Sequence, residues 1–482
     1  MSNENVADGD VRRKGGLGQR IAYACGNLGQ AAFYNAMSTY FVTYVTSCLF
    51  VSYSKALAAQ MIAVITGLIV VIRIAEIFID PLLGNLVDNT TTKWGRFRPW
   101  QFIGGLVSSV LIVLIFSGMF GLVNVNTTLF IVLFIITFIV LDVFYSLRDI
   151  SYWGMIPALS SDSHERSTYT ALGTFTGSIG YNGITVIVIP IVSYFTWTFT
   201  GAKGQGQAGW TSFGFIVALL GLITAWTVAF GTKESTSALR AKAQKNGNPF
   251  EAFKALFQND QLLWVALSYL LYAIANVATT GVLLFLFKFV LDNQAAYSMT
   301  GVIALVAGLI MAPLYPILNK RIPRRVLYIV GMTSMIVAYI LLGLFSTNMT
   351  VVFIALVLFY IPGTLIQMTA ILSLTDSIEY GQLKNGKRNE AVTLSVRPML
   401  DKIAGACSNG IVGAVAIAAG MIGSATAADM TAANIHTFKV WAFYVPLAVI
   451  ILSGVVFLLK VKITEKMHAD IVKQLEEQLN EG

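Results

Sequence analysis

Hydrophobic residues occur in long uninterrupted runs along most of the chain, and short clusters of Gly, Pro and charged residues separate the runs. A run of about 20 apolar residues crosses a bilayer as a helix, because the hydrocarbon core is about 30 Å thick. The runs lack the alternation of polar and apolar positions that is typical of transmembrane barrel strands. They predict twelve membrane-spanning helices, at 21–49, 57–87, 99–119, 128–158, 165–195, 211–232, 261–291, 297–318, 324–345, 350–375, 391–422 and 435–460.

Composition narrows the class of protein. Of 482 residues, 56% are hydrophobic and 12% are charged, whereas a soluble globular protein is about 25% charged. This excludes a soluble enzyme, and the aromatic fraction of 12% argues against a disordered chain. The prediction is an all-α polytopic membrane protein.

The 32 Lys and Arg residues fall mostly in the loops on one side of this topology. Basic loops stay in the cytoplasm, so both termini are predicted to be cytoplasmic. The same bias accounts for the net charge of +8, and no nucleic-acid partner is expected.

The longest polar interruption separates six predicted helices from six more. Weak similarity between 80–83 (DPLL) and 312–315 (APLY), each followed by a basic loop, supports two related halves. This arrangement resembles the major facilitator fold, in which two six-helix halves rock about a midplane site. The predicted parts are an N-terminal tail at 1–20, a first half at 21–232, a central cytoplasmic linker at 233–260, a second half at 261–460 and an amphipathic cytoplasmic tail at 461–482.

The second predicted span carries Arg73, Glu76 and Asp80 on one helical face. A charged side chain at the bilayer centre costs at least about 2.5 to 3.5 kcal/mol, so such residues are functional candidates. Two carboxylates side by side could hold a small cation or share a proton. The alternative is a structural ion pair in which Arg73 neutralises one carboxylate, which still leaves one acid in excess.

The fourth predicted span places Asp142, Tyr145, Asp149 and Trp153 along one stripe, which is predicted to face a cavity. This combination suits a sugar, because carboxylates accept hydrogen bonds from hydroxyl groups and an aromatic face covers the C–H side of a pyranose. The alternative is that Arg148 pairs with one of the acids between helices and that Trp153 anchors the membrane interface.

The eleventh predicted span carries Arg397 and Asp401, which are four residues apart and are expected to pair, and also Lys402. Lys402 would then need a carboxylate partner from the second or fourth span. Loading Glu76 or Asp80 with a proton or metal ion would change this balance, which gives a physical basis for coupled transport.

Several motifs resemble those of the glycoside-pentoside-hexuronide cation symporters, the melibiose permease family. They are 80–84 (DPLLG), 88–90 (DNT) and 95–100 (GRFRPW). Further blocks are most similar to the transport domain of the lactose-galactose permeases of lactic-acid bacteria: 145–159 (YSLRDISYWGMIPAL), 162–166 (DSHER), 376–382 (DSIEYGQ) and 394–402 (LSVRPMLDK).

The resemblance implies roles for individual residues. Glu76 and Asp80 match the cation-site carboxylates, with the Ser146 hydroxyl beside them, and a Glu at 76 favours a proton over sodium. Asp149 and Trp153 match sugar ligands. The expected substrate-binding set is Asp149, Trp153, Tyr145, Lys402 and Arg397, and the expected charge network is Arg73, Asp142, Arg148, Asp401, Lys384 and Glu390.

The chain also departs from the family pattern. Ala31 stands where melibiose-type permeases have a sugar-binding Asp, and Thr174 stands where they have an Arg, so galactoside specificity does not follow from the pattern. Lys387 replaces a histidine in the loop before the eleventh span. The related lactose permeases continue into a phosphotransferase-type regulatory domain, and no such fused domain is expected to act here.

These observations predict a secondary active transporter in the bacterial cytoplasmic membrane that moves a glycoside, an oligosaccharide or pentoside, together with a proton by alternating access. The expected partners are the sugar and the lipid bilayer, with no cofactor beyond the coupling cation and no structural metal. The alternatives are an uncoupled sugar exchanger and a carrier of a non-sugar solute. A membrane enzyme is a further alternative, but the spans contain no mid-span histidine and no base near a nucleophile. A sugar sensor is another, but the sequence shows no appended output domain.

Overall fold

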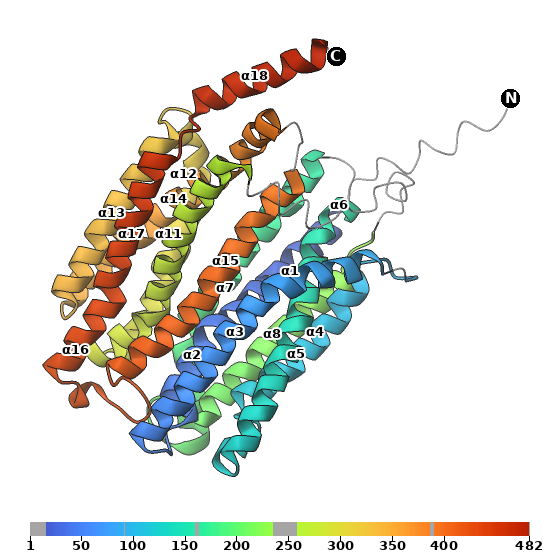
Figure 1. The fold of residues 1–482 in the computed structure, drawn as a ribbon. Coiled ribbons are helices and arrows are strands. Elements are labelled where there is room, and N and C mark those ends of the chain that lie inside the picture. Colours follow the sequence, from blue (N-terminus) through green and yellow to red (C-terminus); the bar gives the residue numbers. More distant parts are fainter. Residues whose placement is uncertain (1–15, 91, 160–162, 235–257, 386–389, 482) are drawn as a thin grey trace. The chain divides into compact units, whose positions relative to one another are not determined.

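The computed structural model describes residues 16–90, 92–159, 163–234, 258–385 and 390–481 (Figure 1). These residues are almost entirely helical, with one isolated antiparallel bridge between Thr92 and Gly95. The chain divides into two compact units. The first unit is Met1–Ala243 with Ile422–Ser424, and the second is Gln244–Met421 with Ala425–Gly482.

Helices of both units follow the hydropathy pattern. The first unit contains α1 (Leu17–Asn35), η1 (Ala36–Tyr40), α2 (Phe41–Tyr44), η2 (Val45–Leu49), α3 (Lys55–Asp88), α4 (Arg98–Phe116), η3 (Leu122–Asn124), α5 (Thr127–Gly154), α6 (Ile156–Leu159), α7 (Ser163–Thr200) and α8 (Gln207–Gly231). The second unit contains α11 (Asp260–Phe285), η4 (Leu286–Val290), η5 (Gln294–Tyr297), α12 (Ser298–Asn319), α13 (Arg324–Phe345), α14 (Met349–Asn385), α15 (Glu390–Ala418), η6 (Ala427–Asp429), α16 (Ala432–Lys439), η7 (Val440–Tyr444), α17 (Val445–Lys460) and α18 (Glu465–Glu481).

Each predicted span corresponds to a helix. Eleven helical segments in the described part of the chain are long and apolar enough to cross a membrane. The first predicted span corresponds to the continuous run from α1 to η2, which π-helical turns interrupt at η1 and η2. The prediction of an all-α protein with twelve spans is therefore confirmed. Most of the predicted linker, residues 235–257, lies outside the described part. The proposed boundaries of the halves and the cytoplasmic position of the termini also remain predictions.

Helix ends follow local sequence signals. Asn126 caps α5 by accepting a hydrogen bond from the Leu129 backbone N–H, and Asn259 caps α11 in the same way through the Leu262 N–H. Pro99 occupies the first turn of α4, where a missing N–H costs nothing. α14 continues to Asn385, ten residues beyond the predicted end at 375.

Small residues let helices of the first unit approach closely. A Cβ atom at Gly180 of α7 would lie 1.9 Å from the Leu28 carbonyl oxygen of α1, and one at Gly29 of α1 would lie 1.9 Å from Thr224 Oγ1 of α8. Glycine is therefore required at both positions, since any larger residue would force the backbones apart. These contacts hold α1 against α7 and α8.

A buried hydroxyl network ties helices of the second unit together. The Ser268 Oγ of α11 lies 2.7 Å from the Tyr328 hydroxyl of α13 and donates to the Ser453 carbonyl of α17 at 3.0 Å. The Tyr328 ring stacks on Phe457 with a centroid distance of 3.7 Å. Such side-chain hydrogen bonds between helices are common in membrane proteins, where they contribute about 0.6 kcal/mol each on average.

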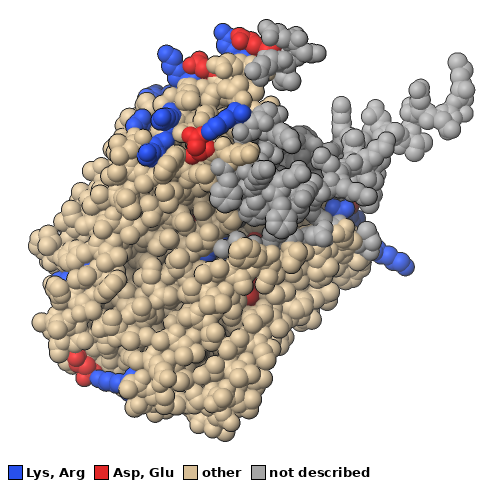
Figure 2. Space-filling model, in the orientation of Figure 1, with Lys and Arg blue, Asp and Glu red and all other residues tan. Residues whose placement is uncertain are grey.

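Uncharged side chains cover the middle of the helices on the face drawn in Figure 2, whereas Lys, Arg, Asp and Glu gather near helix ends and on α18. Large apolar side chains are exposed along many helices, for example Phe78, Leu82 and Trp197. In water this surface would aggregate, so it fits a lipid environment.

Candidate functional site

A buried charge cluster lies in the first unit, between α3 and α5. The Nη1 atom of Arg73 lies 3.0 Å from Glu76 Oε2 and 2.7 Å from Asp142 Oδ1. The Arg73 side chain is 3% exposed, and those of Glu76 and Asp142 are each 5% exposed. One guanidinium nitrogen therefore contacts two carboxylates away from solvent.

Neighbouring side chains enclose this cluster. The Ser146 hydroxyl donates to Glu76 Oε1 at 2.8 Å. The Arg73 guanidinium carbon lies 5.8 Å from the ring centroid of Tyr34 on α1 and 5.9 Å from that of Phe138 on α5. Such distances allow cation–π attraction. Arg73, Glu76, Asp142 and Ser146 are called the Arg73 cluster below.

Helical spacing explains which residues of the cluster lie together on each helix. Arg73 and Glu76 are three residues apart on α3, and Asp142 and Ser146 are four apart on α5, so each pair shares one face of its helix. The packing of α3 against α5 then brings the two pairs together. With both acids ionised, the charged groups of the cluster sum to −1.

Two sequence predictions about α3 can be compared with this geometry. The structural ion pair between Arg73 and a carboxylate of its own helix is present, but the same guanidinium also contacts Asp142, so an excess of negative charge remains. Asp80 lies one helical turn beyond Glu76 and is partly buried.

The residues of the predicted stripe on α5 lie in two different environments. Asp142 belongs to the Arg73 cluster, and Tyr145 is buried between aromatic rings, at centroid distances of 5.7 Å from Phe33 and 5.9 Å from Tyr34. Asp149 is partly buried, and Trp153 at the end of the stripe is 36% exposed.

The Asp149 carboxylate has a partner that the sequence analysis missed. Its Oδ1 accepts a hydrogen bond from Gln30 Nε2 of α1. Gln30 is buried and stands next to Ala31, the position where the family pattern has an acid. A glutamine within a predicted span was the available signal, since a buried amide needs hydrogen-bonding partners.

Arg148 has a neutral partner rather than an acidic one. Its Nη2 donates to Thr224 Oγ1 at 3.3 Å, and its backbone carbonyl accepts from Gln101 Nε2 at 2.6 Å. Arg148 forms no ion pair with a carboxylate within the described residues. The alternative that Arg148 neutralises an acid of α5 is therefore not what this structure shows.

The second unit holds the remaining predicted residues. Asp401 accepts a hydrogen bond from the Tyr269 hydroxyl at 2.6 Å, and Lys402 is partly buried. The side chains of Arg397, Lys387 and Glu390 lie outside the described part, so the predicted pairing of Arg397 with Asp401 stays a prediction.

Lys384 forms an ion pair that the sequence analysis did not anticipate. Its Nζ lies 2.5 Å from Asp260 Oδ1 at the start of α11, and the Tyr380 hydroxyl donates to the same oxygen at 3.0 Å. Both charged side chains are 45% exposed. This pair links the end of α14 to the start of α11.

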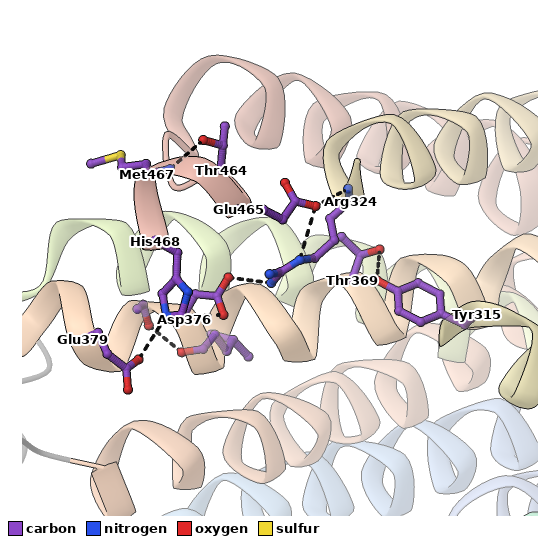
Figure 3. Close-up of polar contacts among 11 residues, drawn as sticks. Tyr315, Arg324, Thr369, Asp376, Glu379, Thr464, Glu465, Met467 and His468 are labelled. Carbon is purple, nitrogen blue, oxygen red and sulfur yellow. Dashed lines mark hydrogen bonds and ion pairs between the residues drawn. The ribbon is translucent and has the colours of Figure 1, made fainter. Parts of the chain in front are cut away.

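A second arginine with two acidic partners joins α13, α14 and α18 (Figure 3). Arg324 Nη1 lies 2.5 Å from Asp376 Oδ2, and its Nε lies 3.4 Å from Glu465 Oε1. His468 of α18 places Nε2 3.5 Å from Glu379 Oε2 and 3.9 Å from Asp376 Oδ1. These five residues are called the Arg324 cluster below.

Both units consist of apolar helices with a few enclosed charges, which is the architecture of a multi-pass membrane protein. A family described as MFS/sugar transport protein matches residues 22–465. The chain therefore belongs to this family of major facilitator sugar transporters, acts in the cell membrane and is not an enzyme. The resemblance derived from the motifs is confirmed.

Two sequence relatives and one solved structure show which transporters the chain is similar to. The chain is 54% identical over 466 residues to a lactose permease of Leuconostoc lactis, covering 97% of this chain and 73% of the relative. It is 37% identical over 460 residues to a raffinose carrier protein of Pediococcus pentosaceus, covering 95% and 72%. A solved D-xylose-proton symporter has the same fold, with a TM-score of 0.63, 16% identity and coverage of 92% of this chain and 98% of that one.

Proposed function

We propose that this sugar transporter carries a glycoside, an oligosaccharide such as lactose or raffinose, together with a proton by alternating access. The similarity to the lactose permease and the raffinose carrier supports this class of substrate. The family assignment argues against a carrier of a non-sugar solute.

Asp149 and Trp153 are the proposed centre of the sugar site. The carboxylate accepts hydrogen bonds from sugar hydroxyls, and the partly exposed indole covers the apolar side of a ring. Gln30 is buried beside Asp149 and its amide holds one carboxylate oxygen in place. Tyr145, Lys402 and Arg397 complete the proposed substrate set from the family resemblance.

Glu76, Asp80 and Ser146 are the proposed cation-coupling residues. The observation that carries this part is the excess of negative charge in the Arg73 cluster, where two enclosed carboxylates face one arginine. Enclosed charge is costly in a low-dielectric environment, so a proton that neutralises one carboxylate changes the stability of the enclosed state. The inward and outward states then interconvert only when the site is loaded.

Uptake of labelled lactose into proteoliposomes tests the proposed substrate class, with raffinose, maltose and xylose as competitors. Lactose or raffinose should compete, and Asp149→Asn should lower uptake by more than about tenfold, because the carboxylate that accepts the sugar hydroxyls loses its charge. Asp429→Asn provides a matched control, since that carboxylate caps the short helix η6 on the surface.

Two results would contradict the proposal. Uptake that none of the four sugars inhibits would remove the substrate class, and full activity of Asp149→Asn would remove the sugar site. Lactose exchange without any accumulation in a proton gradient would instead favour the uncoupled exchanger.

A further inference from the structure

Asp142 of α5 is not among the coupling residues named above, Glu76, Asp80 and Ser146, although the charge excess of the Arg73 cluster depends on it. Its Oδ1 lies 2.7 Å from Arg73 Nη1, compared with 3.0 Å for Glu76 Oε2. Both proposed coupling carboxylates, Glu76 and Asp80, belong to α3, and α5 contributes the neutral Ser146 hydroxyl. Asp142 therefore adds a carboxylate of the second helix to the coupling site.

We propose that Asp142 and Glu76 share the coupling proton as one site built around Arg73. This inference rests on the proposed proton symport and deepens it by naming a carboxylate of a second helix. The residue acts on coupling and not on sugar contact.

The charged and titratable groups that face this site come from three helices of the first unit. α3 contributes Arg73 and Glu76, with Asp80 one turn further along. α5 contributes Asp142, and its Asp149 also interacts electrostatically with Glu76. Tyr34 of α1 places its ring beside the guanidinium. Next to these, Tyr145 and Ser146 of α5 supply hydroxyl groups.

The position of the guanidinium decides which ion fits. A metal ion would need several oxygen atoms gathered around it. Here the space between Glu76 Oε2 and Asp142 Oδ1 is held by Arg73 Nη1, which lies within ion-pair distance of both. A proton needs only one oxygen, so it can bind while the guanidinium stays in place.

The loading step balances in charge. A hydronium ion of the solvent transfers its proton to a carboxylate oxygen of either Glu76 or Asp142 and leaves as water, and the arginine remains paired with the other carboxylate. The charge of the cluster then changes from −1 to 0. The neutral carboxyl group can still donate or accept a hydrogen bond.

The helix α5 links the proposed proton site to the proposed sugar site. Asp142 and Asp149 are seven residues apart on α5, which is about two helical turns, so they lie on the same face. A change in the contact between Asp142 and Arg73 therefore acts on the helix that carries the proposed sugar carboxylate. The Ser146 hydroxyl also links α5 to Glu76, but Asp142 gives α5 a carboxylate in direct contact with Arg73.

The test compares Asp142→Asn with the unmodified protein in proteoliposomes. With lactose, the variant should retain exchange within about threefold and lose at least about tenfold of lactose-driven proton uptake and uphill accumulation, since typical coupling free energies correspond to 5- to 150-fold effects. A sodium gradient should drive no uptake in either protein. Asp429→Asn, the surface control, should behave as the unmodified protein.

Three results separate the possible failures. Unchanged lactose-driven proton uptake in Asp142→Asn, or uptake driven by sodium in the unmodified protein, would overturn the inference. Absence of proton uptake with lactose and raffinose in the unmodified protein would instead overturn the proposed symport. If Asp142→Asn does not fold, Asp142→Glu takes its place: retained exchange with an altered pH dependence of uphill uptake is expected, and an unaltered dependence would contradict the shared site.

Discussion

Arg73 and Arg324 make the same kind of contact in different surroundings. Each arginine contacts two carboxylates, Glu76 and Asp142 in one case and Asp376 and Glu465 in the other. The side chains of the Arg73 cluster are 3% to 5% exposed, whereas Arg324, Asp376 and Glu465 are 16%, 12% and 38% exposed. Arg73 lies inside a long apolar helix, and Arg324 is the first residue of α13.

The difference shows that surroundings decide what such a cluster does. The Arg324 cluster lies near helix ends, and Glu465 is 38% exposed, so water screens part of its charge. His468 Nε2 lies close to both Asp376 and Glu379. The Arg73 cluster has aromatic rings and a serine around it, so a change of one charge there has a larger energetic effect. We infer that the first cluster moves a proton and that the second holds helices together.

Removal of the buried arginine should have the largest effect. Arg73→Met leaves two enclosed carboxylates without a cation and should destabilise the protein by about 3 to 5 kcal/mol. Thermal unfolding in detergent, followed by size-exclusion chromatography, measures this loss. Arg321→Met removes an exposed arginine and serves as the control. Equal melting temperatures for the two variants would contradict the importance of burial.

Removal of the second arginine should have a smaller effect. Arg324→Met removes the arginine from Asp376 and Glu465. Glu465 is 38% exposed and can recover hydration, and His468 stays near Asp376, so a loss of about 1 to 2 kcal/mol is expected. The ratio of protons to lactose should not change. A destabilisation as large as that of Arg73→Met would show that exposure does not distinguish the two clusters.

The smallest effect is expected at the histidine on α18. Its Nε2 lies 3.5 Å from Glu379 Oε2 and 3.9 Å from Asp376 Oδ1. His468→Gln removes these contacts at a cost of less than about 1 kcal/mol, because the side chains are partly exposed. Hydrogen exchange of α18 should be slightly faster in this variant than in the unmodified protein. An acceleration larger than that caused by Arg324→Met would contradict this ranking.

The sequence predicted the helices well, because an apolar run of sufficient length has few other structures available in a membrane. It also predicted that Arg73 and Glu76 would lie on one face, since that depends only on helical spacing. It placed Asp142 both in a stripe that suits a sugar and in a charge network with Arg73. Their direct contact depends on the packing of α3 on α5, which helical spacing does not give.

The contact between Gln30 and Asp149 likewise depends on which helices are neighbours, and periodicity does not contain that information. The contact of α18 with Arg324 has the same origin. The tail was predicted to be an amphipathic helix, but its partner is a helix far away in the sequence.

The same substitution, glutamate to glutamine, at one acidic partner of each arginine tests the central claim most directly. Lactose-driven proton uptake is measured in proteoliposomes that contain Glu76→Gln or Glu465→Gln, with Glu477→Gln as a surface control. Glu76→Gln should abolish proton uptake while lactose exchange continues, and Glu465→Gln should keep the proton-to-lactose ratio of the control. Proton uptake that survives Glu76→Gln, or that both substitutions abolish alike, would contradict the different roles of the two clusters.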